Sequence, residues 1–280
     1  MDEYLAHLAA TSGHLYEALL DHHIDDGLLD GAGGILAAMA DSDGGPAKGL
    51  TAYPDALPAL HRYATLLDSA PASLTRLRSL LRIRAYLRHP PQETPWDPPA
   101  ITALLDRYET LAARTDWPDM IEAHMTDPSA DDFALALWPA DQLGLRPMTA
   151  VLAHLDAVPN DSYAWHWAIR RAARSEAEAV IDLAGRRLAF SPLADPGLDL
   201  RPGPLFALAT TLESLVSGLA AHPGLGHQLL QIAAAAPAER LRRAALRTLR
   251  AWPPEHLPPA LARAAHEIDV DTTPGTGHGA

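Results

Sequence analysis

The sequence predicts an all-α protein in which helical hairpins stack into an array. Three observations predict this fold class. Apolar residues recur at helical spacing along almost the whole chain, which is typical of amphipathic helices. Segments 169–173 and 241–246 both run from an aliphatic residue through two arginines to two alanines. Three joints, at 67–71, 155–159 and 219–223, share the form L-x-x-x-P, in which proline ends one helix before the next begins.

The two arginine–alanine segments begin 72 residues apart, which is two units of 36. A looser relative at 80–87, with Ile83 matching Ile169, lies 86 residues before the first segment, which is two units of 43. A helix that recurs at such a period indicates a stacked array, because one hairpin cannot bury its apolar face alone. The spacing predicts helices over 3–23, 55–68, 72–88, 99–114, 118–126, 129–138, 148–157, 161–173, 176–188, 205–221, 225–235, 238–251 and 258–268.

Glycine and proline mark the segments between these helices. Residues 27–50 hold seven glycines and are predicted to be a loop, and residues 190–204 are predicted to be a second long loop. We therefore expect an acidic N-terminal helix and glycine-rich loop over 1–50 and a helical repeat array over 51–270. The tail over 271–280 lacks core-forming residues and is expected to be disordered.

Composition restricts the function classes. The 280 residues include no cysteine and carry a net charge of −13, so thiolate chemistry is excluded and binding to nucleic acid is disfavoured. No apolar run reaches about 18 residues, and the acidic N-terminus does not resemble a signal peptide. We expect a soluble cytoplasmic protein that does not bind membranes.

The charge is concentrated at the N-terminus. Residues 1–60 hold ten acidic residues and one base, Lys48. We expect residues 1–23 to form an apolar-faced helix that caps the hairpin at 55–88. Its acidic groups would then face Arg76, Arg78 or Arg82, because opposite charges favour docking.

The segment 241–249, read L-R-R-A-A-L-R-T-L, resembles the second helix of a HEAT-type repeat. The likeness is best over 147–268, and it implies a right-handed α-solenoid of HEAT-like helical hairpins. It also implies that the small pairs Ala172-Ala173 and Ala244-Ala245 are buried where helices approach closely. HEAT arrays serve as scaffolds, adaptors and transport factors, and some HEAT-like proteins are DNA glycosylases or chromophore lyases, so the fold does not determine the function.

One acidic cluster has the composition of a metal site. Asp21, His22, Asp25 and Asp26 lie together, with Asp30 close behind, and imidazole and carboxylate groups bind divalent ions. The run from Asp25 to Asp30 is also similar to a D-D-x-x-x-D diphosphate–magnesium motif, although the second metal motif of those enzymes is missing. The alternative is a solvated acidic helix end.

The candidate partner-binding residues are Trp165, Trp167, Arg170, Arg171 and Arg243. The two tryptophans cannot share a helix face, so we expect one in the core and the other beside a groove, where the arginines would complete a binding surface. The alternative is that both tryptophans pack inside the array. The arginines within 76–88 and 240–250 are interpreted either as solvated faces that pair with acids on adjacent repeats or as a concave surface for an anionic partner.

The sequence thus predicts a non-catalytic protein-binding scaffold or adaptor without a cofactor, whose partner is another protein. The rival interpretation is an enzyme on the same fold, either a DNA base-excision glycosylase or a metal-dependent enzyme that uses the Asp21–Asp30 cluster. A deep pocket that holds a carboxylate beside Trp165 or Trp167 would favour the enzyme.

Overall fold

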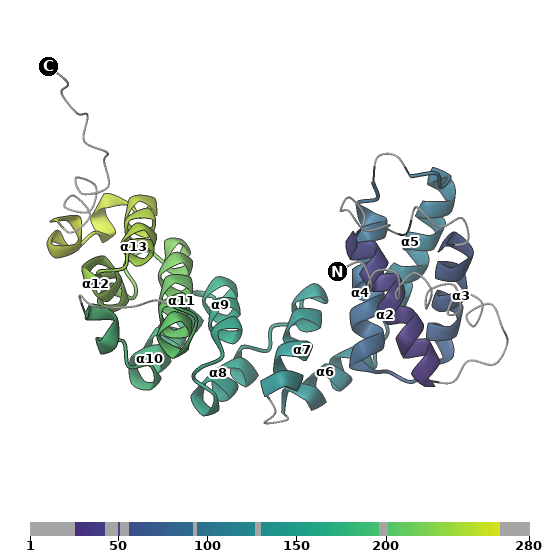
Figure 1. Ribbon diagram of the computed structural model, residues 1–280, viewed down its shortest axis with the longest axis horizontal. Coiled ribbons are helices and arrows are strands. Elements are labelled where there is room, and N and C mark those ends of the chain that lie inside the picture. The colour runs from purple at the N-terminus through teal and green to yellow at the C-terminus, as the bar shows by residue number, and fades with distance from the viewer. Residues whose placement is uncertain are drawn as a thin grey trace, which may run out of the picture. The chain divides into compact units, whose positions relative to one another are not determined.

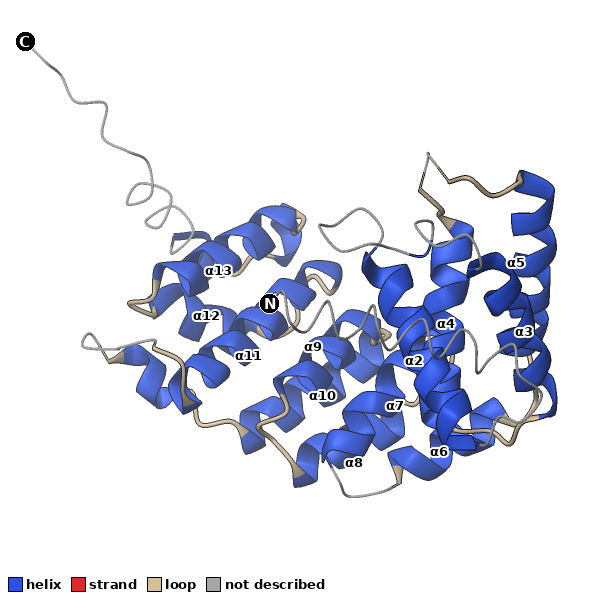
Figure 2. Cartoon of the chain, turned by 45° about the vertical axis from the view of Figure 1, so that its right-hand side comes forward, coloured by secondary structure: helices blue, strands red, loops and turns tan. Residues whose placement is uncertain are grey.

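A computed structural model describes residues 26–42, 50, 56–91, 94–126, 130–195 and 201–263. The residues in these ranges form helices and loops and no strand, so the all-α prediction is confirmed (Figures 1 and 2). The α-helices are α2 (Asp26–Ser42), α3 (Ala56–Ser69), α4 (Leu74–Arg88), α5 (Pro98–Ala112), α6 (Trp117–Met125), α7 (Ala130–Gln142), α8 (Met148–Ala157), α9 (Ser162–Arg171), α10 (Arg174–Arg187), α11 (Pro204–Gly218), α12 (His227–Ala235) and α13 (Glu239–Ala251). Three short 3₁₀ helices are η2 (Ser191–Ala194), η3 (Leu219–Ala221) and η4 (Pro254–His256).

The chain divides into two compact units. Unit 1 comprises Met1–Asp127 and Leu135–Arg146, and unit 2 comprises Pro128–Ala134 and Pro147–Ala280. The division falls inside the range 51–270, which the sequence predicted as one array.

Unit 1 is built around four helices in a closed arrangement. α2 and α5 each pack against both α3 and α4, and α6 also packs against α4 (Figure 1). α4 begins where the side chain of Ser73 accepts a hydrogen bond from the amide of Arg76, as N-cap serines do. All four helices contribute fully buried side chains to the core, among them Leu36, Leu60, Leu77 and Leu104.

The helix α2 corrects the prediction of a glycine-rich loop over 27–50. Leu29, Leu36 and Met39 recur at helical spacing within that segment and are buried, so packing against α3 and α4 stabilises a helix that composition disfavours. Gly33 lies directly over Tyr63, where a Cβ would come within 2.5 Å of the Tyr63 Cζ. This glycine therefore allows close helix packing rather than marking a turn.

Unit 2 arranges its helices in two rows. α11 packs between α9 and α13, so helices two positions apart in sequence are neighbours (Figure 2). α8 and α10 pack against each other and against α9, and α12 packs against α11 and α13. This alternation is compatible with stacked helical repeats.

The two arginine–alanine segments are not equivalent in unit 2. Ala244 and Ala245 lie within α13 and are fully buried, as predicted. Ala172 and Ala173 lie between α9 and α10 with extended backbone, and Ala173 is exposed. The amide of Ala173 donates to the side chain of Glu176, which fixes the start of α10. The prediction of a continuous helix over 161–173 with a buried alanine pair is therefore wrong.

The three L-x-x-x-P joints do separate helices. α3 ends before Pro71, α8 ends before Pro159, and η3 ends before Pro223, so the prediction of helix breaks is confirmed. Each proline follows the end of its helix within three residues, because proline lacks the amide hydrogen that would continue the helix.

One stretch within the described residues, Pro204–Ala221, is long and apolar enough to cross a membrane, with a mean hydropathy of 1.4. It consists of α11 and η3. α11 packs against three other helices of unit 2 and carries Thr210, Glu213 and Ser214 along one side. One third of this stretch is buried within the structure.

Candidate functional site

The predicted metal cluster lies mostly outside the described residues, which include Asp26 but not Asp21, His22 or Asp25. Asp26 belongs to the first turn of α2, and its carboxylate lies 2.6 Å from an Nη atom of Arg76. In the described part of the chain, no group of three or more histidine and acidic side chains could hold a metal ion. The carboxylate of Asp26 is thus engaged by an arginine, and the metal site remains a prediction.

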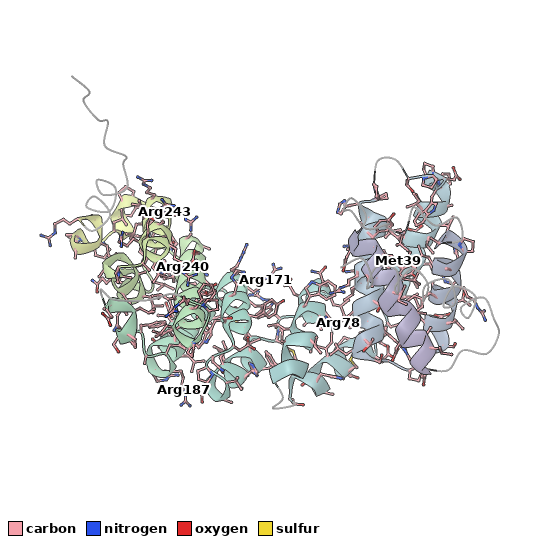
Figure 3. The ribbon with its side chains drawn as sticks, viewed as in Figure 1. Met39, Arg78, Arg171, Arg187, Arg240 and Arg243 are labelled. Atoms are coloured by element: carbon pink, nitrogen blue, oxygen red, sulfur yellow. The ribbon has the colours of Figure 1, made fainter. Side chains whose placement is uncertain are left out.

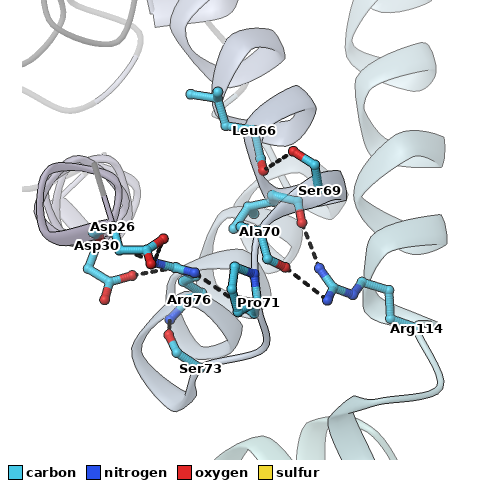
Figure 4. A network of polar contacts seen from close by, with 10 residues as sticks. Asp26, Asp30, Leu66, Ser69, Ala70, Pro71, Ser73, Arg76 and Arg114 are labelled. Carbon is cyan, nitrogen blue, oxygen red and sulfur yellow. Dashed lines mark hydrogen bonds and ion pairs between the residues drawn. The ribbon is translucent and has the colours of Figure 1, made fainter. Parts of the chain in front are cut away.

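Arg76 joins α2 to the connection between α3 and α4. Its Nε donates to Asp30 at 2.7 Å, and its two Nη atoms donate to Asp26 and to the carbonyl of Pro71 (Figure 4). Its side chain is only 3% exposed, so the guanidinium requires these partners. Burial lowers the pKa of Arg76, but the two aspartates outweigh it and the net pKa is raised.

Arg114 holds the other side of the same connection. Its guanidinium donates to the carbonyl of Ala70 after the end of α3 (Figure 4) and to that of Leu67. It also pairs with Asp116 and stacks over the ring of Trp117. The hydrogen bonds from Arg114 lower the pKa of Asp116. Together, the contacts of these two arginines stabilise the connection between α3 and α4, and their role is structural.

Both candidate tryptophans are in the core of unit 2. Trp165 is fully buried and its Nε1 donates to the carbonyl of Pro159 at 2.9 Å. Trp167 is 7% exposed, and its Nε1 has no acceptor among the described residues. The prediction that one tryptophan borders a groove is wrong. Trp165 and Trp167 lie on different sides of the short helix α9, and both side chains are buried against other parts of the protein.

Between these tryptophans, His166 faces α11. Its Nδ1 lies 3.3 Å from the hydroxyl of Ser214, and its Nε2 accepts from Arg170 at 3.4 Å. Since a guanidinium can only donate, the neutral ring carries its proton on Nδ1 and donates to Ser214. Burial and then the charge of Arg170 lower the pKa of His166. A general base needs an unprotonated nitrogen facing the hydroxyl, so this pair is not arranged to activate a serine nucleophile.

Several arginines of unit 2 lie at the end of α9 and on α13, the two helices that flank α11. We define the arginine face by Arg170 and Arg171 at the end of α9 and by Arg240, Arg243 and Arg247 on α13. The last three are spaced at i, i+3 and i+7, which places them on one side of the helix. Figure 3 shows Arg171, Arg240 and Arg243 along one edge of unit 2, with Arg187 at the opposite edge.

Side-chain contacts connect the two ends of this face across α11. Arg240 donates to Thr210, pairs with Glu213 at 3.9 Å, and lies over the exposed ring of Phe206. Thr210 and Glu213 share one face of α11 with Ser214, and Ser214 contacts His166 beside Arg170. These contacts link Arg240 on α13 to His166 and Arg170 on α9 through one face of α11.

The local charge of the arginine face opposes that of the whole chain. Its five arginines are accompanied by Glu213, which pairs with Arg240, and by Glu239, which pairs with Arg243. Arg170, Arg243 and Arg247 are exposed. A surface with this excess of guanidinium groups attracts carboxylate or phosphate groups.

Two pockets lie elsewhere in unit 2. One of about 410 Å³ is formed by the start of α9, the end of α10 and the start of α11, and one of about 600 Å³ is formed by α10, η2 and α12. Their described linings include Arg187, Thr211, Gln228 and Gln231 and contain neither tryptophan nor a carboxylate. They do not match the pocket that a HEAT-like glycosylase would require.

Sequence reasoning identified Arg170, Arg171 and Arg243 but missed the side chains that connect them. Thr210, Glu213 and Ser214 recur at i, i+3 and i+4 within an otherwise apolar helix, and this polar stripe was the available signal. The pairing of Arg240 with Phe206 spans 34 residues, and no local pattern indicates it. Comparison with protein-family models, with curated proteins and with solved structures finds no match for this chain.

Proposed function

We propose that this protein is a non-catalytic scaffold or adaptor that binds an acidic segment of another protein, and that the arginine face of unit 2 is its binding surface. The observation that carries the proposal is the group of exposed arginines at the end of α9 and on α13, on either side of α11, in a chain whose net charge is −13. Arginine is enriched at protein interfaces because its planar group forms paired hydrogen bonds with carboxylates.

The surroundings of the face support a protein partner. Phe206 and Leu205 at the start of α11, and Tyr163 at the start of α9, are exposed large apolar side chains. Binding surfaces commonly combine aromatic anchors with arginine. We therefore propose that the partner segment carries carboxylates for the arginines and at least one apolar residue for the end of α11.

The proposed architecture of unit 2 is a right-handed stack of HEAT-like hairpins in a cytoplasmic protein. Its support is the alternation of α9, α11 and α13 with α8, α10 and α12, together with the burial of Ala244 and Ala245 within the segment that resembles a HEAT helix. In such arrays each repeat adds its exposed side chains to an extended surface.

The test uses two matched arginine pairs. Arg170 and Arg171 end α9, and Arg186 and Arg187 end α10 on the other row. We expect a fluorescent peptide of alternating glutamate and leucine to bind the full chain. Arg170→Glu with Arg171→Glu should weaken binding by about tenfold or more, because charge reversal adds repulsion to the lost contacts. Arg186→Glu with Arg187→Glu should change it less than threefold.

Fluorescence anisotropy at several salt concentrations measures both effects. Equal losses in the two double variants would contradict the assignment of the arginine face. A DNA duplex is the second probe, and we expect only weak binding at physiological salt. Tight duplex binding that is lost on reversing Arg170 and Arg171 would replace the protein partner with a nucleic acid.

A further inference from the structure

His166 lies between the end of α9 and the polar side of α11 in unit 2. These two helices pack side by side (Figure 2). The Nδ1 atom of His166 is 3.3 Å from the hydroxyl of Ser214, and its Nε2 atom is 3.4 Å from an Nη atom of Arg170. Arg170 is exposed, and His166 and Ser214 are half-buried. A group of the partner that approaches Arg170 therefore also approaches the imidazole ring.

The observed contacts of His166 belong to its neutral form. A neutral imidazole can accept a hydrogen bond at Nε2, whereas the protonated ring donates from both nitrogens. Protonation would bring two donors and two positive charges together at the 3.4 Å contact with Arg170, where like charges repel. The contact with Ser214 is compatible with both forms, because a hydroxyl accepts as well as donates. Only the contact with Arg170 depends on the protonation state of the ring.

A carboxylate placed between Arg170 and His166 reverses this balance. It accepts hydrogen bonds from a guanidinium and from an imidazolium, and both bonds are strengthened by charge. An opposite charge within about 4–6 Å favours the charged form of a histidine. Arg170 is already protonated at physiological pH, so His166 is the member of this pair that can gain a proton.

We infer that His166 is a carboxylate-binding residue of the arginine face and that it takes up a proton when the acidic partner binds. The inference rests on the proposed function, because it concerns the same surface and the same partner. In the free protein, neutral His166 accepts a hydrogen bond from Arg170. In the complex, a partner carboxylate lies between the two side chains and accepts from both.

The charged groups on the elements that pack against α9 are bonded elsewhere or exposed. The bonded groups are Glu213 on α11, with Arg240; His154 and Asp156 on α8, with Asp161 and Arg187; and Glu176 and Arg174 on α10, with the amide of Ala173 and the carbonyl of Pro223. Glu178, Asp182 and Arg186 on α10 are exposed, and η3 has no charged side chain. Among the described residues, Arg170 is the one charge that shifts the pKa of His166.

The sign of the pH dependence follows from the free and bound states. Burial and then the charge of Arg170 hold the pKa of His166 in the free protein below its usual value of about 6.5. A bound carboxylate raises this pKa, so the complex holds more protons than the free protein between the two values. The affinity should therefore increase as the pH falls through this window and level off below it. Raising the pKa by about 1 gives about a tenfold gain in affinity.

The test measures affinity from about pH 8 to about pH 5.5, the range in which histidine changes charge. Fluorescence anisotropy follows the peptide of alternating glutamate and leucine. We expect the natural chain to bind it about tenfold more tightly at the acidic end of this range. Protonation of the peptide would weaken binding, so it cannot produce this gain.

Two histidine variants identify the group that takes up the proton. His166→Gln keeps a side chain that donates and accepts hydrogen bonds but that cannot become charged. We expect this variant to lose most of the gain at the acidic end. The matched control is His124→Gln in unit 1, because His124 is also a half-buried histidine on a helix and contacts only the carbonyl of Met120. The control should retain the gain.

Nuclear magnetic resonance of the histidine rings measures the protonation directly. In the free chain, the pKa of His166 should lie below its usual value, and Arg170→Gln should raise it because a repelling charge is removed. Adding the peptide to the natural chain should also raise it. The resonance is identified by its loss in His166→Gln or, if that variant does not fold, by its response to Arg170→Gln.

Three results would overturn the inference: equal affinity at both ends of the pH range, a gain that survives in His166→Gln, or a pKa of His166 that the peptide leaves unaltered. Each of them leaves the proposed function in place, because the peptide still binds. Absence of binding at every pH would instead overturn the proposed function, and the inference with it.

Discussion

Two arginines on α4 of unit 1 and two on α9 and α13 of unit 2 occupy opposite environments. Arg76 and Arg84 on α4 are nearly fully buried, and they bond to carboxylates or carbonyls from helices distant in sequence. Arg170 and Arg243 in unit 2 are exposed. The difference follows from the packing, because α4 is surrounded by α2, α5 and α6 whereas α13 leaves one side without a neighbouring helix among the described residues. The same residue type stabilises one unit and forms a surface on the other.

Removing the partners of a buried arginine should have the largest effect. Asp26→Asn with Asp30→Asn leaves the guanidinium of Arg76 buried without a counter-charge. We expect the free energy of unfolding to fall by about 3 kcal/mol, near the lower end for a broken buried ion pair. Chemical denaturation followed by circular dichroism measures the change.

The matched change in unit 2 is Glu239→Gln, which removes the partner of the exposed Arg243. It should cost only about 0–1 kcal/mol, as exposed pairs do. Similar losses in the two variants would remove the distinction between the units.

Glycine substitutions compare close packing with open space inside α2. Gly33→Ala should destabilise the chain by about 1–3 kcal/mol, since the added methyl group overlaps Tyr63. Gly34→Ala should stabilise it by about 0.5–1 kcal/mol through helix propensity alone. Melting temperatures of the two variants should therefore shift in opposite directions, and shifts of the same sign would show that α2 does not pack as described.

Alanine substitutions compare the two arginine–alanine segments of unit 2. Ala245→Leu should cost about 1–3 kcal/mol because Ala245 is fully buried in α13. Ala173→Leu should be within about 0.5 kcal/mol of neutral, because Ala173 is exposed between helices. Urea denaturation of both variants tests this. An equal cost at both positions would restore the structural equivalence that the sequence suggested.

The smallest expected effect is on the pH dependence of stability, through the pair of Arg114 and Asp116. Hydrogen bonds from Arg114 lower the pKa of Asp116 in the folded state. A carboxylate with a lowered pKa contributes stability above its usual pKa, and this contribution is lost as the pH falls below about 4. Asp116→Asn should therefore lower the free energy of unfolding at neutral pH. The free energy of unfolding of this variant should also fall less steeply between about pH 4 and pH 2 than that of the natural chain. An unchanged acid denaturation profile would mean that the pair is not maintained in solution.

Local patterns predicted the helices well and the environment of charged residues poorly. The helix predicted at 148–157 has the observed bounds, and that at 72–88 begins two residues early. α2 was missed because glycine disfavours helices, and its burial against α4 is not visible in its own sequence. The arginines of 76–88 were expected to lie on a solvated face and to pair with acids of adjacent helices. The burial of Arg76 and Arg84 was not expected, since their partners lie 46 to 58 residues away. The resemblance to HEAT repeats remains a prediction.

The central claim is that unit 2 presents Arg170, Arg243 and Arg247 for binding, whereas Arg76 and Arg84 of unit 1 are enclosed by their own partners. Modification of the full chain with an arginine-selective dicarbonyl, read by mass spectrometry with and without the acidic peptide, tests it directly. Arg170, Arg243 and Arg247 should react first and should be protected by the peptide, whereas Arg76 and Arg84 should react slowly in both conditions. Fast modification of Arg76, or peptide protection of Arg186 and Arg187 equal to that of Arg170, would contradict the account.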